Sequence, residues 1–87
     1  MPNLLPARFE FLRIEATLAM TFIRAAKSYS ILEHSARALG NARKALEQIQ
    51  RGLANPIGLA TEEIEFLEQR CIEIESALLV FGPATQE

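Results

Sequence analysis

The chain is poor in the residues that cross-link proteins or build β-sheets. It has no Trp and only one residue each of Cys, His, Tyr and Val. A single Cys excludes an internal disulfide and any zinc site that needs several cysteines. Because valine and aromatic residues favour strands, their scarcity argues against a β-sheet protein. The four glycines are not clustered, so we expect no glycine-rich loop that would hold a phosphate.

An excess of one charge is also absent. Nine basic and eleven acidic residues give a net charge of −2, which does not favour an obligate nucleic-acid binder or a disordered acidic tail. No run of eighteen residues is free of charge, so we expect no membrane-spanning helix. The single Cys favours a reducing, cytoplasmic location. The first residues lack the basic start and the uninterrupted apolar core of a signal peptide.

Residues that favour helices dominate the composition, with thirteen Ala and twelve Leu. We therefore predict an all-α protein that forms one domain over residues 1–87. The expected helices span about 7–28, 31–53 and 61–81, and residues 82–87 form a frayed tail. By area scaling, a chain of 9.7 kDa buries about 64% of its unfolded surface. Because such a core is thin, we expect stability to depend on a second copy or a partner.

The expected helix boundaries follow from capping residues, proline and glycine. Ser30 and Glu33 have the spacing of a capping box, which predicts a break just before them. Apolar residues continue at helical spacing through this segment, so a single helix over 7–53 is the alternative. An Asn-Pro pair and a glycine within 54–60 predict the second turn, and Thr61 is the expected N-cap of the last helix.

Two of the expected helices carry apolar residues in a heptad pattern that alternates steps of three and four. Because a short turn joins them, we predict an antiparallel hairpin with coiled-coil packing. A flanking line on the middle helix has only small residues, Ala38, Ala45 and Gly52, which would let another helix approach closely. The two seams consist of Leu32, Ser35, Leu39, Ala42, Leu46, Ile49 and Leu53 in the middle helix, and of Ile64, Leu67, Cys71, Ile74, Leu78 and Phe81 in the last.

The first expected helix is apolar on two faces, over an arc of about 240° on an ideal wheel. We expect a three-helix bundle to leave one face exposed, and a large exposed apolar patch usually marks a contact surface. One face comprises Phe11, Ile14, Leu18, Phe22 and Ala25, and the other comprises Phe9, Leu12, Ala16, Ala19, Met20 and Ile23. The residues that we expect in an interface are Phe11, Leu18, Phe22 and Ile23 of the first helix and Phe66, Ile72 and Leu79 of the last.

No catalytic or metal-binding pattern stands out in the sequence. His34 is the sole histidine, and the adjacent Glu33 points to a different side of a helix, so it does not form a catalytic pair with His34. Cys71 occupies a seam position, where a buried thiol acts as a small apolar side chain. Glu15 lies at the edge of the apolar arc with Arg8 on the same side, and it either reaches water or pairs across a subunit interface. We therefore expect no enzymatic activity, no metal and no cofactor.

The sequence thus favours a non-enzymatic helical module for protein–protein interaction. The expected partner is a second copy, with a dimer favoured, or a helical segment of another protein. An alternative is a nucleic-acid-binding or regulatory helical dimer that uses Arg37, Lys44 and Arg51, spaced by seven on the middle helix, together with Arg43. Carboxylates interleave with this basic stripe and no aromatic residue is available to stack bases, so nucleic acid is the less favoured partner.

Overall fold

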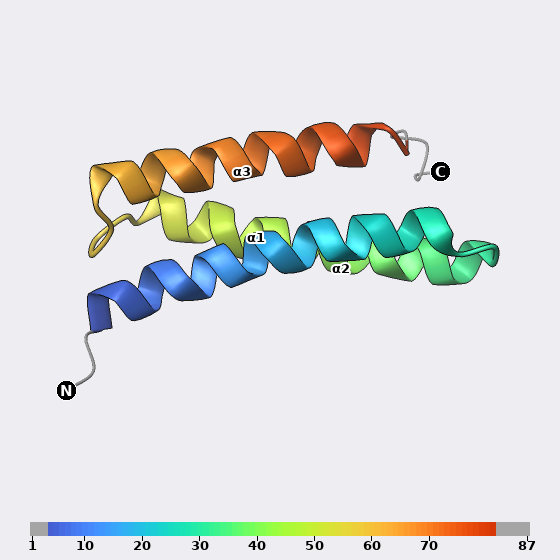
Figure 1. Ribbon diagram of the computed structural model, residues 1–87, viewed down its shortest axis with the longest axis horizontal. Coiled ribbons are helices and arrows are strands. Elements are labelled where there is room, and N and C mark those ends of the chain that lie inside the picture. The colour runs from blue at the N-terminus through green and yellow to red at the C-terminus, as the bar shows by residue number, and fades with distance from the viewer. Residues whose placement is uncertain (1–3, 82–87) are drawn as a thin grey trace.

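A computed structural model describes residues 4–81 of the chain. Three α-helices account for most of this range: α1 (Leu4–Ser28), α2 (Leu32–Ala54) and α3 (Thr61–Leu79). Successive helices run in opposite directions, so α2 is antiparallel to both α1 and α3 (Figure 1). No strand occurs between residues 4 and 81, and the all-helical prediction is therefore confirmed for that range. The tail predicted over 82–87 lies outside the described residues.

The turn between α1 and α2 settles whether the first two helices are continuous. The chain leaves helical geometry after Ser28 and resumes it at Leu32, so the alternative of one long helix is wrong. The predicted capping box is also wrong, because the N-cap is Ile31 and no side chain caps this end. A different serine closes the turn, since the Ser35 hydroxyl donates to the Ala26 carbonyl oxygen at 2.8 Å.

The turn between α2 and α3 spans residues 55–60. Gly58 adopts a φ of 89°, a backbone conformation that favours glycine because it has no Cβ. Ala60, rather than the predicted Thr61, is the N-cap of α3. Its backbone N–H donates to Oε1 of Glu63 at 2.9 Å, which satisfies one donor at the start of the helix.

The core forms where the small residues of α2 meet α1. α1 packs more extensively on α2 than α3 does, so the bundle is not simply a hairpin of α2 and α3 with an added helix. At Gly52, an added Cβ would lie 2.6 Å from Cδ1 of Leu12, which shows how closely the two helices approach. The predicted role of the small-residue line is therefore confirmed. The buried apolar residues are Leu12, Ala16, Ala19, Ile23 and Ala26 of α1, Ala38, Leu39, Ala42, Ala45, Leu46 and Ile49 of α2, and Leu67, Cys71 and Ile74 of α3.

The heptad seams are buried along most of their length but not at the start of α2. Leu32 was predicted to lie in the seam, yet its side chain is 82% exposed. The reason is the length of the third helix. α3 ends at Leu79, short of the turn that joins α1 to α2, so it does not reach the first turn of α2 (Figure 1).

Besides the packing of Leu12 on Gly52, the side chain of Arg8 connects the N-terminal half of α1 to the end of α2 by hydrogen bonds. The guanidinium of Arg8 donates to the carbonyl oxygens of Gly52 (3.2 Å), Asn55 (2.6 Å) and Ile57. These groups lie at or just beyond the C-terminus of α2, where carbonyls lack helical partners and a cation is favoured. Arg8 is therefore engaged with α2 and the turn that follows it, not with Glu15.

Candidate interaction surface

The two apolar faces of α1 have different environments in the folded chain. The inner face is buried against α2 and α3. The outer face is not covered, and Phe11, Ile14 and Leu18 are 51%, 49% and 40% exposed. Side chains of this size are seldom left together at the surface of a small domain unless they contact something. The expectation that the bundle leaves one face of the first helix open is confirmed.

Two of the expected interface residues on α1 are less accessible than Phe11 and Leu18. Ile23 is 1% exposed and lies in the core, where it faces α2 and α3 instead of a partner. Phe22 is half-buried and packs against both groups of buried residues. A helical wheel does not show which of these residues is buried. Both faces of α1 are apolar, so periodicity does not indicate which face turns inward.

The expected interface residues on α3 do not join the open face of α1 either. The ring of Phe66 meets that of Phe9 edge to face, with centroids 5.8 Å apart, and the guanidinium of Arg70 lies 5.1 Å from its centre. Phe66 therefore faces α1 along the junction of the two helices. Ile72 and Leu79 are exposed and lie seven residues apart, on the side of α3 that points away from the bundle.

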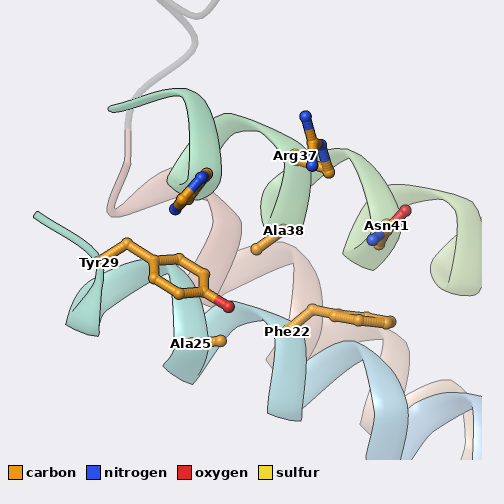
Figure 2. A pocket seen from close by; sticks show the side chains of 7 residues that line it. Phe22, Ala25, Tyr29, Arg37, Ala38 and Asn41 are labelled. Atoms are coloured by element: carbon orange, nitrogen blue, oxygen red, sulfur yellow. The ribbon is translucent and has the colours of Figure 1, made fainter. Parts of the chain in front are cut away.

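A groove at the turn between α1 and α2 lies beside the outer face of α1 (Figure 2). We call it the turn-end groove, and its volume is about 310 Å³. The rings of Phe22 and Tyr29 stand at its two ends, with Ala25 and Ala38 between them (Figure 2). Tyr29 and His34 pack edge to face with ring centroids 5.5 Å apart. The groove is lined by Phe22, Ala25 and Tyr29 of the α1 end and by His34, Arg37, Ala38 and Asn41 of α2.

The open face of α1 and the groove form one continuous row. We call this row the α1 stripe. Successive members are three or four residues apart, which keeps them on one side of a helix. They extend the outer face by one aromatic residue that the sequence analysis did not include, Tyr29. Its only sequence signal was its helical spacing from Phe22 and Ala25. The α1 stripe consists of Phe11, Ile14, Leu18, Phe22, Ala25 and Tyr29.

A second groove, of about 200 Å³, runs between α1 and α3 and is lined by three arginines. Two of these arginines are already paired within their own helices. Arg13 contacts Glu10, and Nη1 of Arg70 lies 3.0 Å from Oε1 of Glu73. The hydroxyls of Thr17 and Thr21, which also line the groove, donate to backbone carbonyls one turn earlier. Several of its donors are therefore engaged, which weakens any affinity for an anion, although the buried Nε of Arg70 has no hydrogen-bond partner among the described residues.

The residues of the alternative nucleic-acid surface are only partly brought together. Arg37, Lys44 and Arg51 are exposed along one line of α2. Arg43 is half-buried and lies on another side, in line with Gln50, whose amide donates to Glu75 of α3 at 3.0 Å. Three cations, one of which borders the turn-end groove, are a small number for a phosphate-binding face.

The remaining chemically interesting residues are dispersed. Cys71 is buried, and burial raises the pKa of its thiol, with smaller contributions from the carboxylates of Glu75 and Glu68. His34 is exposed and Glu15 is half-buried. Among the described residues, no three His, Cys, Asp or Glu side chains gather closely enough to hold a metal ion. None of the helices in the described part of the chain has the length and apolar character needed to cross a membrane.

Comparisons with family models, with curated proteins and with solved structures find no match for this chain. The α1 stripe and the groove at its end are therefore interpreted from geometry and physical chemistry alone.

Proposed function

We propose that this chain is a non-enzymatic helical interaction module that assembles with a second copy through the α1 stripe. The observation that carries the proposal is the half-exposed row of Phe11, Ile14 and Leu18 on a helix whose neighbouring inner face is already buried in the core. Helix-on-helix burial would be its chemistry, with large apolar side chains as the anchors.

The distribution of side-chain size on α1 supports this proposal. Three of the five buried residues on its inner face are alanines, whereas Phe11, Ile14 and Leu18 on its outer face are all large. If stability of the single chain were the only requirement, the large residues would be favoured inside, because burying them contributes more. The reverse arrangement is typical of a helix that packs closely on one neighbour and contacts another molecule with its open side.

The expected affinity follows from the area that remains exposed. Burying the exposed half of a large apolar side chain contributes about 1 kcal/mol, so three such residues on each of two copies contribute about 6 kcal/mol. The partly exposed rings of Phe22 and Tyr29 on both copies add about 3 kcal/mol, while association costs at least about 4 kcal/mol. The net gain of about 5 kcal/mol or less corresponds to a dissociation constant of about 0.1–1 mM, which a measurement at one dilute concentration would miss.

The test is the solution mass by light scattering and sedimentation equilibrium, from about 10 µM to about 1 mM. The wild-type chain should change from monomer to dimer across this range. Leu18→Glu places a charge in the α1 stripe and should keep the chain monomeric. Thr17→Glu is the matched control, because it adds the same charge at the preceding residue, which is exposed and lies outside the stripe. A wild-type monomer at every concentration, or a Leu18→Glu dimer as stable as the wild type, would contradict the proposal.

A further inference from the structure

We infer that the turn-end groove is the receptor for Phe11 of a second copy, so that two α1 helices pack antiparallel around Leu18. This inference rests on the proposed self-association and adds its register and its anchor. It requires that the α1 stripe match itself when it is reversed, and that the groove suit an aromatic ring.

The α1 stripe does match itself when reversed about Leu18. In an antiparallel pair centred there, residues at equal distance on either side of Leu18 face each other. Phe11 lies seven residues before it and Ala25 seven after, so a large side chain meets a small one. Ile14 lies four before and Phe22 four after. A two-fold interface of this kind uses the same patch on both copies and closes as a dimer.

The groove has the shape of a hole for a knob from a facing helix. In coiled-coil packing, a side chain inserts between four residues of its neighbour, which lie at positions i, i+3, i+4 and i+7. Phe22, Ala25, Ala26 and Tyr29 have this spacing. Three of them line the groove, and the fourth, Ala26, is buried in the core. Ala25, one of the apolar lining residues, is the residue that faces Phe11 of the second copy in this register.

The size and chemistry of the groove also suit a phenyl ring. Its volume of about 310 Å³ exceeds the roughly 150 Å³ of a cavity that accepts benzene. The rings of Phe22, Tyr29 and His34 border it and offer edge-to-face contacts. Arg37 is exposed at its rim and can lie over an inserted aromatic face.

Charges beside the stripe agree with the same register. Glu10 lies eight residues before Leu18 and Arg24 lies six after, on the same side of α1. An antiparallel pair centred on Leu18 brings Glu10 of one copy within one turn of Arg24 of the other. In a parallel pair the equivalent flanks of the two helices lie on opposite sides of the interface, so Glu10 and Arg24 of different copies would not meet.

A size-swap experiment tests the contact between Phe11 and Ala25. Phe11→Ala removes the knob and Ala25→Phe fills the hole. Each should weaken dimerisation by about thirtyfold, because the two-fold dimer loses the contact of Phe11 with Ala25 twice. The double variant restores a large residue opposite a small one and should recover most of the loss. Helical content by circular dichroism checks that each monomer is folded. If the double variant raised the dissociation constant by the product of the two single-variant fold-changes, the assignment of this pair would be overturned.

Cross-linking tests the register without relying on affinity. Cys71 is first replaced by Ala, and single cysteines are then placed at positions 11, 18 and 25 for a short thiol-to-thiol reagent. Leu18→Cys should cross-link to itself, whereas Phe11→Cys should cross-link to Ala25→Cys when the two variants are mixed, but not to itself. Self-linkage of Phe11→Cys would show a parallel pair and overturn the inference. A wild-type dimer with no cross-link at Leu18 would overturn the register but leave self-association intact, while a wild-type monomer would reject both.

Discussion

The inner and outer faces of α1 are equally apolar by residue type but differ in what surrounds them. On the inner face, Leu12 packs over Gly52 so closely that a methyl group on the glycine would clash. On the outer face, Phe11 and Leu18 remain about half exposed. The difference shows that residue type alone does not decide burial in this bundle. The decisive property is side-chain size, because only the face with the alanines can approach the small-residue line of α2.

This comparison separates two contributions that one helix makes. The inner face stabilises a single copy, so its contribution is independent of protein concentration. The outer face, by the proposal above, stabilises an assembly, so its contribution grows with concentration.

The sharpest test of the comparison truncates one large residue on each face. Ile23→Ala creates a cavity in the core and should lower the free energy of unfolding by about 2–5 kcal/mol at every protein concentration. Leu18→Ala should lower it by about 1 kcal/mol or less in dilute solution, where the chain is monomeric. Urea unfolding at several protein concentrations measures both. If the effect of Leu18→Ala did not increase with concentration, the outer face would have no role in assembly.

The next largest effect on the unfolding free energy is expected at Arg8, which binds the end of α2. Arg8→Ala removes donors to three carbonyl oxygens at the end of α2 and in the turn beyond it, and we expect a loss of about 1–3 kcal/mol of unfolding free energy. Lys44→Ala is a suitable control, because it also removes one exposed cation from a helix. A loss at Arg8 no larger than that at Lys44 would show that these hydrogen bonds contribute little in solution.

Alanine substitutions at two glycines of α2 should change the unfolding free energy by smaller amounts and in opposite directions. Gly40→Ala should raise the unfolding free energy by about 0.5–1 kcal/mol, since alanine is the better helix former and nothing lies within 4 Å of the added Cβ. Gly52→Ala gains the same helix propensity, but the added methyl group overpacks Leu12. We therefore expect the unfolding free energy to fall by about 1 kcal/mol. The melting temperatures of the two variants relative to wild type provide the measurement. Equal increases would mean that α1 is not held against Gly52 in solution.

The smallest effect concerns the thiol between α2 and α3. Burial raises the pKa of Cys71, so the folded chain resists forming the thiolate more than the unfolded chain does. The contribution of the neutral thiol is fully present below the ordinary cysteine pKa and is lost as pH rises through the raised one. Stability should therefore fall between about pH 8 and pH 10 more in the wild type than in Cys71→Ala. Urea midpoints across this range measure the difference, and parallel curves would contradict it.

Much of the fold was predictable from the sequence because it depends on local patterns. The all-helical class follows from composition, and the second turn follows from its Asn-Pro pair and glycine. The heptad predicted that Ile49, Leu67 and Ile74 would be buried, and each is 0% exposed. Capping was less predictable. Ser30 had the right spacing but does not cap α2, because packing and the bond from Ser35 to Ala26 determine that turn.

The candidate site was predictable only in part. The apolar surplus of α1 is already present in the sequence, since apolar residues occupy about two-thirds of its circumference. The packing of the three helices then turns Ile23 inward, leaves Phe11 and Leu18 outside, and brings Tyr29 and His34 together at a groove. The sequence does not contain this outcome because periodicity describes one helix at a time. The choice between two apolar faces depends on how closely a neighbouring helix can approach, and a groove between helices exists only once both are in place.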